Sequence, residues 1–216
     1  MTTVQVIAAD APAQQSMTAD DVSIVPMKRE DLETERLRQV TYLHKVGLSD
    51  AKPCCCCFSQ GYEEVHKTFR KGLLEADDLK LEVFGIAVTG GGDVVGYVML
   101  GFHDTAGDVC MRDVPCLMSA LKPRQGTCHL EQIVVGEKAR GKGVSTKLLT
   151  WADNKARARG CKKIHLEVIG RNRHAKQVYE KFGYKVHDSM CEHCYCCPVL
   201  CCLMRVPYLH NMEKDL

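Results

Sequence analysis

The chain has 216 residues, 45% hydrophobic and 26% charged, a composition typical of a globular protein and not of a disordered one. Lys and Arg outnumber Asp and Glu by only 29 to 27, which argues against a general nucleic-acid-binding protein. The charge is uneven, because residues 137–185 contain 14 basic and 4 acidic residues. This basic third favours a localised anionic ligand, and a solvated basic helix face would explain it equally well.

The fourteen cysteines are clustered: four are consecutive at 54–57, and six more lie between Cys191 and Cys202. The first twenty residues contain no Lys or Arg and no sustained apolar run, so no secretory signal is expected. We therefore expect a cytoplasmic protein with free thiols. The longest uncharged stretch of the cysteine-rich end, residues 194–204, is too short to span a bilayer, so no integral membrane contact is expected.

The first half of the chain predicts a loose tail over residues 1–20, followed by a single domain over 21–216 with cysteine-rich loops at about 50–60 and 190–205. Residues 103–126 show no clear period and are long for a connection. Apolar spacing predicts a strand over 22–27, helices over 29–46 and 62–74, and strands over 81–89 and 94–102 joined by a glycine-rich turn.

The second half alternates regularly between strands and helices. Strands are predicted over 130–135, 163–169, 184–188 and 208–214, and helices over 144–158 and 172–182. Gly160 and Gly183 each follow a predicted helix at the position where glycine ends it. This alternation predicts a parallel βαβ core joined to an antiparallel N-terminal part.

The segment Arg140–Ser145 lies between a predicted strand and a predicted helix. The free N–H groups and positive dipole of a helix N-terminus bind phosphate, and Gly143 lets the backbone approach closely. Arg140, Lys142 and Lys147 add positive charge. The spacing matches neither the dinucleotide-binding G-x-G-x-x-G pattern nor the Walker pattern.

Four motifs occur in order: Leu130–Val135, Arg140–Gly143, Asn172–Ala175 and Tyr179–Tyr184. Together they resemble the GNAT superfamily of acetyl-CoA-dependent N-acetyltransferases. The resemblance implies an α/β (α+β) fold, with a mixed central sheet of six to seven strands and about four flanking helices. It also implies that the strands at 130–135 and 163–169 splay apart, so that acetyl-CoA as co-substrate lies between them.

The resemblance implies roles for particular residues. Tyr179 would be the catalytic acid that protonates the leaving thiolate, and Glu131 would be the base, with His129 as the second candidate. Core packing of Tyr179 and a purely orienting Glu131 remain the structural alternatives. Ser145 departs from the usual Gly or Ala, and Glu167 is expected to be structural. The implied cofactor-binding residues are Ile133, Val134, Val135, Arg140, Gly141, Lys142, Gly143, Val144, Ser145, Asn172, Ala175 and Tyr179.

The acceptor is expected to be a small-molecule or peptide amine, because family members acetylate many amines on one scaffold. The alternative functions are an acyl-CoA-binding protein without turnover and a cysteine-cluster module that binds zinc or is S-acylated for peripheral membrane docking. No metal ligand is assigned among the site residues, and both a monomer and a homodimer remain open. The cysteine clusters are predicted to lie near each other at the substrate entrance.

Overall fold

The computed structural model describes residues 18–49, 62–105, 123–170, 172–191 and 208–216. Apart from Cys191, the two cysteine clusters lie outside this described part, as does most of the predicted N-terminal tail, so the predictions for them concern residues that the structure does not describe. Within the described ranges, seven strands form one sheet in the order β1-β2-β3-β4-β5-β7-β6. The strands are β1 (Val22–Pro26), β2 (Phe84–Thr89), β3 (Val94–Gly101), β4 (Thr127–Val135), β5 (Lys163–Ile169), β6 (Lys185–Cys191) and β7 (Tyr208–Asp215).

Five α-helices and three short 3-10 helices accompany the sheet in the described residues. They are η1 (Ala19–Asp21), η2 (Arg29–Glu33), α1 (Glu35–Ser49), α2 (Tyr62–Glu75), α3 (Asp78–Glu82), η3 (Glu137–Ala139), α4 (Val144–Ala158) and α5 (Arg173–Lys181). The predicted mixed α/β sheet with flanking helices is confirmed. No helix in the described ranges is long and apolar enough to cross a membrane.

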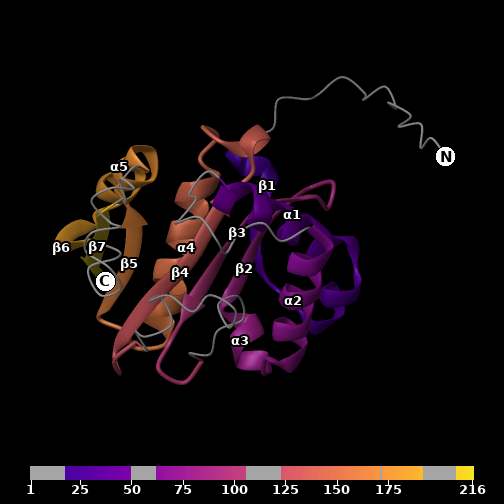
Figure 1. Cartoon of the computed structure of the whole chain (residues 1–216), viewed down its shortest axis with the longest axis horizontal. Coiled ribbons are helices and arrows are strands. Elements are labelled where there is room, and N and C mark those ends of the chain that lie inside the picture. The colour runs from indigo at the N-terminus through magenta and orange to yellow at the C-terminus, as the bar shows by residue number, and fades with distance from the viewer. Residues whose placement is uncertain (1–17, 50–61, 106–122, 171, 192–207) are drawn as a thin grey trace, which may run out of the picture.

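One strand pair, β4 with β5, is parallel, and the other neighbours pair antiparallel. The last strand, β7, lies between β5 and β6 (Figure 1). The β5-α5-β6 unit therefore joins two strands that run in the same direction but are not neighbours. The βαβ alternation predicted the direction of these strands, and it gave no sign that the final strand separates them.

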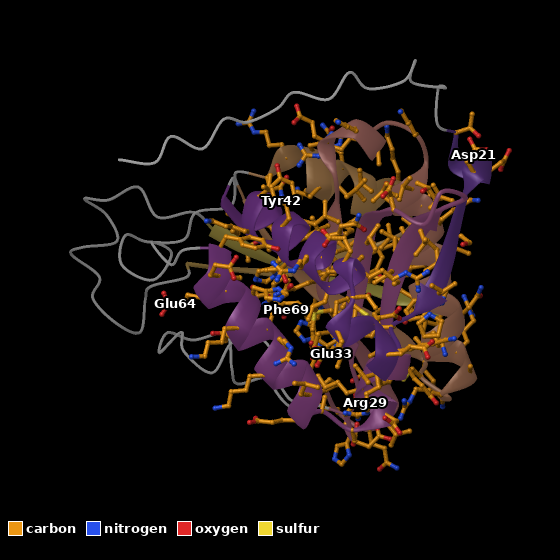
Figure 2. The ribbon with its side chains drawn as sticks, turned by 90° about the vertical axis from the view of Figure 1, so that its right-hand side faces the viewer. Asp21, Arg29, Glu33, Tyr42, Glu64 and Phe69 are labelled. Atoms are coloured by element: carbon orange, nitrogen blue, oxygen red, sulfur yellow. The ribbon has the colours of Figure 1, made fainter. Side chains whose placement is uncertain are left out.

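Helices α1 and α2 cover one face of the sheet and α4 covers the other (Figure 1). Successive side chains of a strand point to opposite faces, so Tyr97 belongs to the α1–α2 core and Val98 to the α4 core, each with 0% exposure. Phe69 lies inside the first core, whereas the Glu64 side chain of the same helix points away from it (Figure 2). Two separate apolar cores thus fix the sheet between them.

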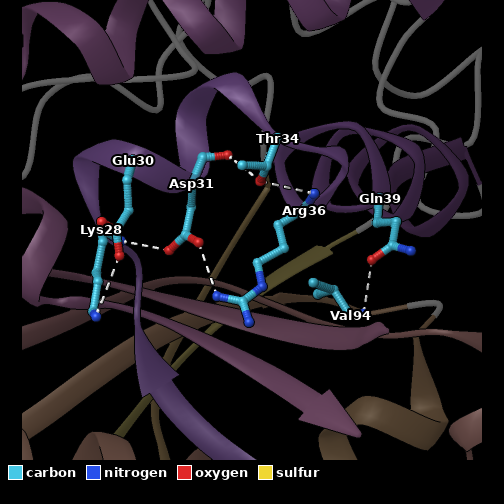
Figure 3. A network of polar contacts seen from close by, with 7 residues as sticks. All are labelled: Lys28, Glu30, Asp31, Thr34, Arg36, Gln39 and Val94. Carbon is cyan, nitrogen blue, oxygen red and sulfur yellow. Dashed lines mark hydrogen bonds and ion pairs between the residues drawn. The ribbon is translucent and has the colours of Figure 1, made fainter. Parts of the chain in front are cut away.

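Polar contacts join the start of α1 to the preceding residues and, through Gln39, to the sheet (Figure 3). Asp31 accepts the backbone N–H of Lys28 at 2.9 Å and forms an ion pair with Arg36 at 2.8 Å. Further along the helix, the side-chain oxygen of Gln39 accepts the N–H of Val94 at 2.8 Å. Since Val94 begins β3, the Gln39 contact fixes α1 relative to that strand, while the Asp31 contacts join α1 to the segment that precedes it.

Several predicted element bounds differ from the structure: β4, for example, begins at Thr127 and not at residue 130. Side-chain capping explains two of the other differences. The helix predicted over 29–46 is interrupted at Thr34, whose hydroxyl donates to the carbonyl of Asp31 and accepts the N–H of Arg36. The strand predicted from residue 81 begins at Phe84. The preceding residues form α3 because Asp77 caps it, accepting the N–H of Lys80 at 2.9 Å.

Candidate active site

The two parallel strands separate beyond their first three residues. Thr127–His129 of β4 pair with Lys163–His165 of β5, and the pairing between these strands ends there. On its other edge β4 contains a bulge: Leu100 lies opposite Leu130 and Met99 opposite Gln132. Glu131 is therefore the extra residue in β4, and the bulge bends this strand where it parts from β5. The splayed strands implied by the family resemblance are thus present.

The unpaired edge of β4 carries backbone groups that can bind a ligand. Gly136 donates its N–H to Val95 of β3 at 2.9 Å. Because backbone groups alternate in direction along a strand, Val134 also faces β3, while Ile133 and Val135 face the open edge. The Val135 carbonyl accepts Nε of Arg140 at 3.2 Å. Three residues of β4 were predicted to bind the cofactor. Val134 differs from the other two because its backbone groups face β3 and its side chain is buried in the α1–α2 core.

The loop after β4 has the geometry of an anion site. Gly141 and Gly143 adopt positive φ angles of 73° and 80°, the left-handed region that favours glycine. Gly143 is the N-cap of α4 and makes no side-chain cap bond, and the first turn of α4 contains no acidic residue. The first N–H groups of α4 can therefore bind an anion. Lys147, predicted to add charge here, instead donates to the carbonyl of Val22 at 3.0 Å.

The remaining loop residues differ in exposure. Val144 is buried at 1% exposure and anchors the start of α4 in the core. Lys142 and Ser145 are half-buried, and Arg140 is exposed. The loop therefore presents basic and small side chains beside the start of α4, and buried Val144 fixes that start in place. Positive charge and open space at a helix N-terminus suit a pyrophosphate group.

Helix α5 places the second motif. The side-chain oxygen of Asn172 accepts the N–H of Ala175 at 3.1 Å, so Asn172 caps this helix. Ala175 is half-buried against the α4 core. Tyr179 is buried at 8% exposure and meets the ring of Tyr184 edge-on, with centroids 5.8 Å apart. Burial raises the pKa of Tyr179, so its phenol keeps its proton at neutral pH.

Glu131 and His129 lie on the same face of the sheet. His129 is directly opposite Gly101 in β3, and a Cβ added to Gly101 would lie 2.5 Å from Oε1 of Glu131. Opposite residues in an antiparallel pair project to one face, so both side chains lie over Gly101. The sequence predicted this shared face from simple alternation, whereas the bulge is what sets the position of Glu131.

His129 is held by a carboxylate from the neighbouring strand. Its Nε2 lies 2.6 Å from Oε2 of Glu167, and its ring stacks on His165 with centroids 4.8 Å apart. Burial lowers the pKa of His129, but the hydrogen bond and charge of Glu167, together with the charge of Glu131, outweigh it and raise that pKa above its usual value. Burial also opposes ionisation of Glu167, yet His129 holds the pKa of that carboxyl below its usual value.

A second group of polar side chains, centred on His44, lies beside the bulge, and it was not predicted from the sequence. Nδ1 of His44 lies 2.9 Å from the hydroxyl of Tyr97 and 3.1 Å from Oε1 of Gln132, and that hydroxyl donates to Gln132 at 3.0 Å. These residues come from α1, β3 and β4. Their meeting depends on long-range register, which periodicity along the chain does not contain.

The family comparison agrees with this geometry. Residues 53–184 match the acetyltransferase (GNAT) family model, which is more than half of the chain. The chain therefore belongs to the GNAT family.

Curated relatives match shorter parts. The acetyltransferase Atu2258 of Agrobacterium fabrum is 33% identical over 66 residues, which cover 31% of this chain and 47% of that protein. The spermine/spermidine N(1)-acetyltransferase of Bacillus subtilis is 25% identical over 100 residues, covering 46% of this chain and 57% of that protein. The matches thus span about half the length of these relatives.

Among solved structures, the NatC complex bound to Gag peptide and CoA contains a chain of similar fold. It aligns with a TM-score of 0.60 and 17% identity, covering 91% of this chain and 99% of that one. At this identity the similarity supports the fold.

Proposed function

We propose that the protein transfers an acetyl group from acetyl-CoA to a primary amine by direct attack. The observation that supports this most strongly is the combination at β4: its open edge, its bulge at Glu131, and the glycine-lined start of α4 immediately after it. Family membership supports acyl-CoA as the donor. We also propose the cytoplasmic location that the sequence predicts.

The residues around β4 would hold the donor. The N–H groups at the start of α4, with Arg140, Lys142 and Ser145 beside them, would bind its pyrophosphate. The open backbone groups of Ile133 and Val135 would bind its pantetheine arm by strand-like hydrogen bonds, and Asn172 and Ala175 would line the other side. Acetyl-CoA would supply the acetyl thioester.

Glu131 is the proposed base. A primary amine has an ordinary pKa of about 10.4 and is mostly protonated at neutral pH, so a carboxylate that accepts its proton assists attack. His129, held by Glu167, is the alternative base on the same face. Tyr179 would donate its phenolic proton to the thiolate that leaves when the C–S bond breaks, and burial keeps that phenol protonated.

One assay tests this proposal: release of free CoA thiol with a panel of amines, for the wild type, Gly143→Asp and Tyr179→Phe. The polyamine-acetylating relative makes spermine and spermidine sensible first acceptors. Gly143→Asp places a carboxylate at the expected phosphate position and should abolish acetyl-CoA binding. Tyr179→Phe should lower kcat by about 10²-fold or more with little change in acetyl-CoA affinity.

The assay also separates the alternative, an acyl-CoA-binding protein without turnover. Acetyl-CoA that binds and stabilises the wild type, with no thiol release for any amine, would establish that alternative. Unchanged acetyl-CoA affinity in Gly143→Asp would remove the basis of the cofactor site. Equal losses of affinity and turnover in Tyr179→Phe would assign that residue a structural role.

A further inference from the structure

Three potential metal ligands meet on the face of the sheet that carries Glu131. His129 and His165 are register partners across the parallel β4–β5 pair, and their rings stack at an interplanar angle of 8°. Glu167 is two residues beyond His165 and therefore on the same face of β5. The ligand atoms of the three side chains all lie within 4.8 Å of one another.

The chemistry of this set is that of a divalent transition-metal site. Two imidazoles and one carboxylate form the ligand set of open, three-ligand zinc sites, and imidazole favours zinc over the hard cations that prefer oxygen alone. Among the described residues this is the one group of three or more such side chains placed to hold an ion. We propose that His129, His165 and Glu167 form a Zn²⁺-binding site, and that zinc bound there inhibits acetyl transfer.

The surroundings make the site both rigid and reachable. All three ligands come from paired strands, so their Cα positions are fixed by the ladder. The side chains of His129 and Glu167 are 16% and 10% exposed, so they are held by neighbours but not sealed from solvent. Nε2 of His129 now lies 2.6 Å from Oε2 of Glu167. A short outward movement of the two imidazoles and the carboxylate would make room for an ion among them, with water as its fourth ligand.

Inhibition follows from the position of the site. His129 is two residues from Glu131, and both side chains lie over Gly101 on one face of the sheet. A bound Zn²⁺ adds two positive charges beside the proposed base, which repel a cationic amine and draw the carboxylate toward the metal. The inference goes beyond the proposed function, since the metal site stands on its own ligands and only its effect on turnover depends on acetyl transfer.

The test compares metal binding by full-length wild type with that by His165→Phe, which keeps a ring to stack on His129 but removes a ligand nitrogen. Thiolates are Zn²⁺ ligands in their own right, so the readout is the difference between the two proteins in calorimetric titrations with Zn²⁺ and in Co²⁺ absorption spectra. Wild type should bind one more equivalent of Zn²⁺ than His165→Phe does, or should bind one equivalent at least about tenfold more tightly than the variant does. The Co²⁺ difference spectrum should lack sulfur-to-cobalt charge transfer, because the ligands are nitrogen and oxygen.

Two variants complete the design. His187→Phe removes a 70% exposed histidine of β6 and should leave binding as in the wild type. Glu167→Gln should reproduce the loss seen in His165→Phe, and it serves as the test if His165→Phe does not fold. Inhibition of His165→Phe by Zn²⁺, measured relative to the metal-free turnover of the same variant, should be weaker than inhibition of the wild type by at least about tenfold.

Equal stoichiometry and affinity in wild type, His165→Phe and Glu167→Gln would overturn the site. A difference spectrum with thiolate bands would also overturn it and assign the ion to cysteines. Metal binding at the site without inhibition would overturn the regulatory effect alone. Absence of acetyl transfer with every amine would contradict the proposed function. The comparison of Zn²⁺ binding between wild type and the variants would still test the metal site.

Discussion

Gly101 controls where the carboxylate of Glu131 lies. A Cβ at this position would come within 2.5 Å of Oε1 and 3.2 Å of Cδ of Glu131. The obstructed group is the end of a flexible side chain, so Gly101→Ala should move the carboxylate and leave the backbone in place. We expect at least about tenfold lower kcat with a small change in thermal stability, because misplacing a reacting group by an ångström is costly. Steady-state kinetics and thermal denaturation of one preparation check this.

Gly96→Ala is the matched control on the same strand. There the new Cβ would lie 2.8 Å from the backbone oxygen of Val134, which cannot rotate away. This substitution should destabilise the protein by about 1–3 kcal/mol, as overpacking does. If Gly101→Ala instead lost as much stability as Gly96→Ala and retained its kcat, the carboxylate of Glu131 would not be a reacting group.

Glu131→Gln tests the same group by its chemistry. The amide has nearly the shape of the carboxylate but cannot accept the proton of the amine. We expect kcat/KM to fall by about 10²–10⁴-fold for alkyl amines. The loss should be smaller for acceptors of lower amine pKa, which are already unprotonated. An equal loss for every acceptor would instead favour an orienting role for Glu131.

At the scale of elements, His44 joins α1 to β3 and β4 beside the bulge. Burial lowers the pKa of His44 to about 4, although the hydrogen bond to Gln132 raises it in part. The unfolded chain takes up this proton near pH 6.5 and the folded chain does not. Stability should therefore fall as the pH drops from 6.5 to 4, by up to about 3 kcal/mol, and should be unaffected by this group above that window.

Replacing His44 isolates that contribution. His44→Gln removes the titrating group and keeps a polar side chain toward Tyr97, so its free energy of unfolding should depend less on pH between 6.5 and 4. Urea denaturation of both proteins at several pH values measures the difference. Parallel pH profiles for wild type and His44→Gln would contradict the prediction.

Elements with strong local signals were predictable from the sequence. The bounds of α4 and β5 agree with the prediction at both ends, because glycines flank α4 and alternation marks β5. The break before α1 and the short α3 were not predictable from apolar spacing. Both depend on side chains that bind the backbone, Thr34 and Asp77, and such capping competes with the periodic pattern.

The candidate site was predictable in its motifs but not in its contacts. The glycine loop and Tyr179 follow from local sequence and family resemblance. The pairing of His129 with Glu167, and its stacking on His165, depend on the register of two strands separated by a helix. A one-residue shift would turn these side chains to the opposite face, so no pattern within either strand determines the contact.

At the scale of the whole molecule, the final strand ties the sheet to α4. β7 pairs with both β5 and β6, and Lys214 from this strand reaches Asp153 of α4 at 2.5 Å. The ammonium also lies 4.0 Å from the centroid of the Phe182 ring. The side chains of Lys214 and Asp153 are only 17% and 11% exposed. Because water solvates them poorly, each charge is neutralised mainly by the other. The C-terminal strand is thus fixed to the α4 core by a largely buried ion pair.

Breaking this pair from one side should be costly. Lys214→Met leaves the Asp153 carboxylate buried without its cation, and its Oδ1 already has no hydrogen-bond partner among the described residues. We expect a loss of about 3–5 kcal/mol in the free energy of unfolding, as for other buried pairs that lose one partner. Asp153→Leu combined with Lys214→Met removes both charges, so the double variant should be more stable than Lys214→Met alone. Chemical denaturation of the wild type, Lys214→Met, Asp153→Leu and the double variant measures this coupling, and additive losses would show that the pair does not hold β7 to α4.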